Sequence, residues 1–193
     1  MPEPARMDDH AISNLRYIRE AMERASAFTS IPGWGGVGVG LTAIAAAVLA
    51  HGKSGRDWLW IWLGEAAVAA VIAAIAMVRK AARANVSFRG APARRFFISY
   101  SAPLIAGAAL TLVLARAEIF VVLPAAWLLL YGVSFVSSGA YSIPLVPVMG
   151  VCFMVFGLVA CFLPFVAANA LLGVGFGGLH VLFGFLIARR YGG

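Results

Sequence analysis

The stretch Trp58–Lys80, WLWIWLGEAAVAAVIAAIAMVRK, decides the fold class of this 193-residue chain. Before Arg79 it carries a single charged side chain, that of Glu65. An α-helix rises about 1.5 Å per residue, so about 20 apolar residues cross the hydrocarbon core of a lipid bilayer. The stretch therefore predicts a transmembrane helix that carries one acid inside the bilayer.

Apolar runs of this kind recur along the whole chain. Hydrophobic residues make up 62% of the sequence and charged residues 12%, which is about half of the charged fraction usual in soluble domains. The runs predict an all-α integral membrane protein, a bundle of six transmembrane helices. We place the spans at about residues 32–50, 58–78, 97–115, 119–136, 144–163 and 168–188. The expected organisation is an N-terminal segment (1–29), a six-helix transmembrane domain (30–188) and a short tail (189–193).

The number of spans depends on residues 97–136, which could form one long helix or two. This segment is far too long for a single crossing, and Pro103 and Pro124 are expected to interrupt it. We therefore expect two antiparallel spans joined by a tight turn at residues 116–118, which makes the number of spans even.

Lysine and arginine are distributed unevenly between the expected loops. One side would hold the basic residues of the N-terminal segment, of the loop 79–95 and of the tail, whereas the other side holds only Lys53, Arg56 and Arg116. Cytoplasmic loops of membrane proteins carry an excess of lysine and arginine. We therefore expect a protein of the cytoplasmic (inner) membrane with both termini in the cytoplasm.

The formal net charge of +7 is explained by the same loops. Basic residues at the cytoplasmic face attract anionic lipid head groups, at about 1 kcal/mol for each nearby residue. We therefore expect anionic lipids as partners at this face, and no nucleic acid. On the opposite side, Trp58, Trp60 and Trp62 are expected at the membrane interface, where indole rings are enriched.

The first thirty residues differ from the rest because they are polar and charged. They lack the apolar core and the small-residue cleavage site of a secretory signal, so we expect no cleaved leader. Leu15, Ile18, Met22 and Ala25 recur at three- and four-residue steps, which predicts an amphipathic cytoplasmic helix over residues 8–28. Periodicity does not identify what covers the apolar stripe. Two interpretations stay open: docking on a partner or a second copy, or packing on the membrane surface or the protein's own loops.

Four glycines are candidates for helix packing: Gly36 and Gly40 in the first span, and Gly173 and Gly177 in the last. The members of each pair are four residues apart and lie on one helix face. Small residues at this spacing let two helix backbones approach closely in lipid. We expect the first and sixth spans to pack against each other or across a dimer axis. The alternative is that these residues only reflect the abundance of glycine in membrane helices.

Glu65 and His180 are the two ionisable side chains expected at depth in the bilayer. A carboxylate there costs several kcal/mol unless it is paired or protonated. The two side chains would meet if the second and sixth spans are neighbours, and a carboxyl–imidazole pair could relay a proton. Glu65 and His180 are therefore the candidate intramembrane polar site. The alternative for Glu65 is a hydrogen-bonded tie between two helices.

The spans carry no His-x-x-x-His pattern, no cluster of acids and no evident nucleophile–base pair. We therefore expect no catalytic residues, no metal site and no bound cofactor, and we do not expect an enzyme. The favoured hypothesis is a non-enzymatic multi-pass membrane protein that forms a homo-oligomer or serves as an accessory subunit of a membrane complex. The alternative is a small proton- or cation-coupled transporter or channel that uses Glu65 and His180.

Overall fold

The computed structural model describes residues 12, 14–15, 27–84, 88 and 90–192. The amphipathic helix expected over residues 8–28, and with it nearly all of the N-terminal segment (1–29), lies outside the described residues. The described chain is helical, and the extended pairing within it is limited to an isolated bridge between Phe28 and Ser142.

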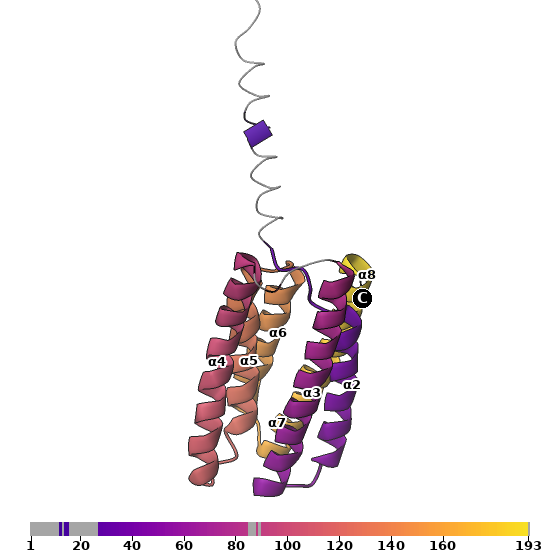
Figure 1. Ribbon diagram of the computed structural model, residues 1–193. Helices are drawn as coiled ribbons and strands as arrows, with labels where there is room; N and C mark the ends of the chain where they lie inside the picture. The colour runs from indigo at the N-terminus through magenta and orange to yellow at the C-terminus, as the bar shows by residue number, and fades with distance from the viewer. Residues whose placement is uncertain (1–11, 13, 16–26, 85–87, 89, 193) are drawn as a thin grey trace, which may run out of the picture.

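Helical elements follow one another along residues 33–191 and run side by side (Figure 1). The last three, of which η1 is a π-helix, form one continuous segment, Phe165–Tyr191. The elements are α2 (Gly33–Leu49), α3 (Gly55–Arg83), α4 (Ala91–Arg116), α5 (Leu123–Gly139), α6 (Leu145–Ala160), α7 (Phe165–Leu172), η1 (Gly173–Leu179) and α8 (His180–Tyr191).

Three of the segments are long and apolar enough to cross a membrane: α3, α4 and the continuous segment from α7 to α8. Helices α2, α5 and α6 are also apolar but have only 16 or 17 residues each, so they are about 24–26 Å long. The all-helical architecture of the expected fold class is therefore confirmed, with three long apolar segments and three shorter ones.

The two shorter helices in the second half of the chain are bounded by prolines. Helix α5 begins at Leu123, later than expected, because a turn with Glu118 in the left-handed region precedes it. Pro124 then occupies the first turn of α5, where no backbone N–H is needed. Helix α6 ends at Ala160, earlier than expected, and Pro164 follows it. Proline cannot continue a helix at that point because it lacks the N–H and its ring clashes with the preceding turn.

The interruption expected at Pro103 does not occur, because α4 continues through this residue to Arg116. A proline inside a helix provides no N–H for the carbonyl four residues earlier, which here belongs to Ser99. The hydroxyl of Ser137 on α5 lies 2.9 Å from this carbonyl, and it also lies 2.8 Å from the Val133 carbonyl of its own helix. A neighbouring helix thus offers a donor, shared with its own backbone, to the carbonyl that the proline leaves without a partner, which helps to preserve the helix.

The helices form two groups that are joined by the last segment (Figure 1). In one group α2 packs against α3 and against η1 and α8; in the other, α5 packs against α4 and α6. Helices α3 and α4 face each other from opposite sides of the bundle and do not pack along one another. Each is held mainly by its own group, so a space remains between them.

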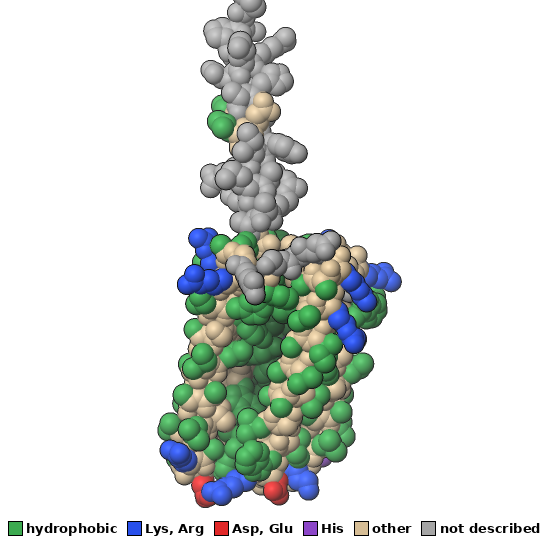
Figure 2. Space-filling model, in the orientation of Figure 1, with side chains coloured by type: hydrophobic (Ala, Val, Ile, Leu, Met, Phe, Trp, Pro, Cys, Tyr) green, Lys and Arg blue, Asp and Glu red, His purple; other side chains and the backbone are tan. Residues whose placement is uncertain are grey.

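Charged side chains lie at the two ends of the bundle, and the face between them is largely hydrophobic (Figure 2). Val71 of α3 and Ile105 of α4, for example, are 58% and 67% exposed. Both ends of the described chain lie at one end of the bundle (Figure 1). The helix ends found there carry Arg79, Lys80, Arg83, Arg94, Arg95, Arg189 and Arg190; the opposite end carries Lys53, Arg56, Asp57, Arg116 and Glu118.

Trp58 and Trp62, two of the three tryptophans expected at a membrane interface, point into the bundle. Their side chains are 0% and 4% exposed, whereas Trp60, on the opposite face of α3, is 68% exposed. Both buried indole N–H groups donate to Oδ1 of Asn169 on α7, at 2.7 and 3.0 Å. Positions four apart share a helix face, so one buried amide binds both indoles. This contact ties α3 to the start of the last segment.

Candidate functional site

A cavity of about 550 Å³ opens between α3 and α4. Figure 2 shows it as a hollow, lined by hydrophobic side chains, in the side of the bundle. It exists because α3 and α4 do not pack along one another and because α3 presents small side chains to it. These are Ala66, Ala69, Ala70, Ala73 and Ala74. The polar and aromatic residues of the wall include Trp62, Glu65, Tyr100, Thr111, Trp127, Tyr131, Phe135, Phe176 and His180.

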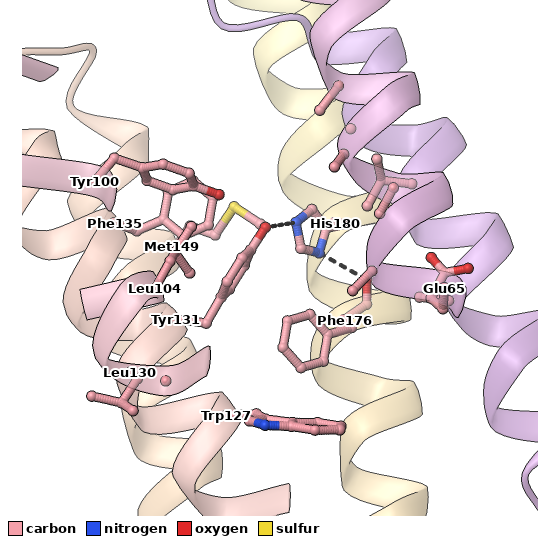
Figure 3. A pocket seen from close by; sticks show the side chains of 18 of the residues that line it. Glu65, Tyr100, Leu104, Trp127, Leu130, Tyr131, Phe135, Met149, Phe176 and His180 are labelled. Carbon is pink, nitrogen blue, oxygen red and sulfur yellow. Dashed lines mark hydrogen bonds between the residues drawn. The ribbon is translucent and has the colours of Figure 1, made fainter. Parts of the chain in front are cut away.

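His180 is held at the inner wall by two hydrogen bonds (Figure 3). Its Nδ1 lies 2.8 Å from the carbonyl oxygen of Phe176, and its Nε2 lies 2.9 Å from the hydroxyl oxygen of Tyr131. A carbonyl can only accept, so Nδ1 carries a proton; in the neutral imidazole Nε2 then accepts, and Tyr131 donates to it. The imidazole is therefore satisfied, and it is only 6% exposed.

At the end of the π-helix η1 the Phe176 carbonyl pairs with the side chain of His180 instead of its backbone N–H. In a regular α-helix the backbone N–H of His180 would donate to this carbonyl, four residues earlier. Here that N–H donates to the carbonyl of Gly177, and the Phe176 carbonyl accepts from the His180 side chain. π-helical turns are rare and occur frequently at functional sites. The coincidence of η1 with His180 and the cavity marks this wall as the candidate site.

Tyr131 lies at the centre of an aromatic cluster. Its ring contacts those of Phe135, Phe153 and Phe176 edge to face, with centroids 4.9, 5.0 and 4.9 Å away. Aromatic rings prefer this geometry because the positive edge of one meets the negative face of the other. The hydroxyl of Tyr100, on α4, adjoins that of Tyr131 (Figure 3). The cluster fixes the ring of Tyr131 and thereby positions its hydroxyl beside His180.

Glu65 and His180 both line the cavity, but they do not form a pair with each other. Oε1 of Glu65 accepts a hydrogen bond from the hydroxyl of Thr42 on α2, at 2.9 Å. Figure 3 shows Glu65 apart from the His180–Tyr131 pair, and no hydrogen bond between Glu65 and His180 occurs in the described chain. Each has a partner of its own, and Glu65 links α2 to α3.

The four candidate packing glycines lie at a contact within the chain, between α2 and the last segment. A Cβ at Gly36 would lie 3.2 Å from Cα of Gly184, and one at Gly40 would lie 2.6 Å from the carbonyl oxygen of Gly177. Gly173 and Gly177 both face α2. Because this face is occupied inside a single chain, the same glycines are not available for contact across a dimer axis.

A second glycine contact, between α5 and α6, was not among the expected ones. A Cβ at Gly132 would lie 2.7 Å from the carbonyl oxygen of Gly150, and one at Gly150 would lie 2.7 Å from that of Gly132. Gly139 and Gly157 extend the same contact toward Pro147 and Leu129. The sequence does carry a signal for this contact. Gly132 and Gly139 are seven residues apart, as are Gly150 and Gly157, and seven residues are about two helical turns, so each pair lies on one helix face.

No group of three or more His, Cys, Asp or Glu side chains that could hold a metal ion occurs in the part of the chain that the structure describes. No protein-family model matches this chain, and no significant match was found among curated proteins or among solved structures. The site geometry alone therefore has to indicate the function. Its volume lies within the range of about 300–1,000 Å³, and its mainly apolar wall with few polar groups is typical of small-molecule pockets.

Proposed function

We propose that the protein is a non-enzymatic integral membrane protein that holds a lipid-like small molecule in the cavity between α3 and α4. The observation that carries this proposal is the direction in which the cavity opens. It opens sideways, through the hydrophobic face between the charged ends of the bundle (Figure 2). A ligand that enters there comes from the hydrocarbon core of a bilayer and not from water. This role suits the accessory function expected from the sequence.

Insertion into a membrane is supported by the distribution of exposed side chains. Contiguous apolar surface on this scale is unusual on soluble monomers, and here it lies between two charged ends. We propose that the more basic end, with both termini, faces the cytoplasm of a bacterial-type inner membrane, because cytoplasmic loops are rich in lysine and arginine. A fluorescent protein fused after residue 193 should then fluoresce, and an alkaline phosphatase fused there should be inactive. An active phosphatase would contradict this orientation.

The volume of the cavity suits a small molecule. Small-molecule pockets have about 300–1,000 Å³, and this cavity, at about 550 Å³, lies within that range. A ring or a chain of a lipid-like molecule could fill the space beside His180.

The test is the lipid content of the purified protein after extensive washing in detergent. Ala70→Phe places a ring into the cavity from α3, where Ala70 lines the wall. Ala67→Phe makes the same change on the exposed, outward face of the same helix and serves as the matched control. Mass spectrometry should find a retained lipid-like molecule with the wild type and with Ala67→Phe, and far less of it with Ala70→Phe. Equal retention by all three proteins, or none by any, would refute the proposal.

A second candidate function is proton or cation transport, because Glu65 and His180 line the same cavity. In that case Glu65→Gln should abolish flux in reconstituted vesicles, whereas the hydrogen bond from Thr42 could still form with the amide oxygen. If the wild type shows no flux above empty vesicles while it retains a lipid-like ligand, the binding function stands and transport does not.

A further inference from the structure

We infer that the ligand of the cavity is an isoprenoid quinone, a flat ring with neutral oxygens attached to an apolar tail. This inference rests on the proposed function, because it names the chemical class of the molecule that the same cavity would hold. Three properties of the wall lead to it: its lack of basic groups, its aromatic surfaces and its hydroxyl groups.

The residues of the wall disfavour a charged head group inside the cavity. Within the described chain no lysine or arginine lines the cavity, and Glu65 is its one acidic residue. The phosphate of a phospholipid or the carboxylate of a fatty acid would therefore be buried without a cationic partner, and Glu65 would repel it when ionised. Burying an unpaired charge is strongly unfavourable. A ligand whose head lies inside the cavity must therefore have a neutral head.

The aromatic side chains favour a flat ring over a branched or two-chain lipid. Tyr100, Trp127, Tyr131, Phe135 and Phe176 line the cavity from α4, α5 and η1, whereas α3 contributes mainly alanines. Small side chains on one side and ring surfaces on the other leave a space that suits a planar ring, which can stack on or meet the edges of the aromatic groups. The opening between α3 and α4 then lets a single apolar tail extend outward.

The hydroxyl groups provide the hydrogen bonds that a quinone needs. The Tyr131 hydroxyl donates to His180, which is fixed by the Phe176 carbonyl, so the proton of Tyr131 is already in use. The Tyr100 hydroxyl adjoins that of Tyr131 at the cavity wall, and because the Tyr131 proton goes to His180, Tyr100 donates to the Tyr131 oxygen when the cavity is empty. A phenolic hydroxyl has one proton, which can turn about the C–O bond, and it is also an acceptor. The Tyr100 proton can therefore turn from Tyr131 to a quinone carbonyl, or the Tyr100 oxygen can accept from a quinol hydroxyl, while His180 holds Tyr131 in place.

The test is the binding of decylubiquinone to the full chain in detergent micelles, followed by quenching of tryptophan fluorescence. Trp62 and Trp127 line the cavity, so a bound quinone would quench their emission. We expect saturable quenching with the wild type and with Ala67→Phe, and only the linear quenching of free micelle-dissolved quinone with Ala70→Phe. Tyr100→Phe should weaken binding about two- to tenfold, as expected for the loss of one hydrogen bond. Tyr191→Phe, at the exposed end of α8, should not.

Infrared difference spectra provide a readout that a purely structural role of Tyr100 would not change. The carbonyl band of bound decylubiquinone should shift to lower frequency in the wild type, and Tyr100→Phe should lose part of this shift. Dioctanoylglycerol, which has two chains and no ring, should not displace the quinone. If the protein retains a lipid that Ala70→Phe excludes but decylubiquinone shows no saturable binding, the quinone assignment is refuted while the proposed function survives.

Discussion

Asn169→Leu should destabilise the protein more than any other single replacement of a polar side chain in the last segment. Its Oδ1 accepts from the indole N–H groups of Trp58 and Trp62, which are 0% and 4% exposed. Leucine has the same branched shape and the same number of side-chain heavy atoms, although it is bulkier, so the main effect is that two buried donors lose their acceptor. An unsatisfied buried donor costs about 1–3 kcal/mol. The replacement should therefore lower the free energy of unfolding by about 2–6 kcal/mol.

The assay is unfolding of the detergent-solubilised protein with sodium dodecyl sulfate, followed by circular dichroism. The decisive comparison is a mutant cycle, which isolates the energy of interaction between the partners. In a Trp58→Phe, Trp62→Phe background both donors are absent, so adding Asn169→Leu should cost less than about 1 kcal/mol, because removing both partners of a hydrogen bond is nearly neutral. Trp60→Phe, 68% exposed, is the control and should change stability by less than about 0.5 kcal/mol. An equal cost of Asn169→Leu in both backgrounds would refute the reasoning.

Three further predictions concern the packing, the surface and the basic end of the bundle. Gly40→Leu should lower the free energy of unfolding by more than about 2 kcal/mol in the same assay, because a Cβ there would lie 2.6 Å from a backbone oxygen of the facing helix. Gly64→Leu is the control and should be tolerated, because a Cβ at Gly64 would have no neighbouring atom within 4 Å. Equal effects of the two replacements would contradict the helix contact at Gly40. Replacing Arg56 by Gln should lower the free energy of unfolding by less than about 1 kcal/mol, because the ion pair of Arg56 with Glu118, 3.4 Å apart, has both side chains 70% exposed. A larger loss of stability would contradict this weak contribution of the pair. Lys80→Met should speed removal of the C-terminus by carboxypeptidase, because the ammonium of Lys80 donates to the backbone carbonyls of residues 31 and 192; unchanged rates would contradict this anchoring.

The helical segments could be predicted from the sequence because apolar runs and prolines act locally. The same rules fail where a distant residue intervenes. Pro103 satisfies every local criterion for an interruption, yet α4 continues through it, and the Ser137 hydroxyl of the next helix lies within hydrogen-bond distance of the Ser99 carbonyl. No rule confined to residues 99–103 contains that hydroxyl. The exact partner depends on how α5 is rotated against α4, which only the packed structure determines.

The candidate polar residues could also be predicted from a local sequence signal, whereas their hydrogen-bond partners could not. Glu65 and His180 are conspicuous because ionisable groups in apolar runs are rare. Thr42 and Tyr131, which bind them, are ordinary in such runs and give no comparable signal. Asn169 is intermediate between these two groups. An amide in an apolar run is unusual and can be noticed in the sequence, but its role depends on two tryptophans more than 100 positions earlier in the chain.

The π-helix connects the packing of the last segment with its site. Gly177 and Gly184 must face α2, because the two backbones are too close there for a side chain. His180 lies between them in the sequence and must instead reach Tyr131 at the cavity wall. At the end of the π-helix the backbone N–H of His180 donates to the carbonyl of Gly177, and its imidazole bonds to the carbonyl of Phe176. A Cβ at Gly173, Gly175 or Gly177 would lie 2.8, 2.7 or 2.5 Å, respectively, from side chains of the neighbouring helices. The glycine-rich stretch therefore serves helix packing and places His180 at the wall of the cavity.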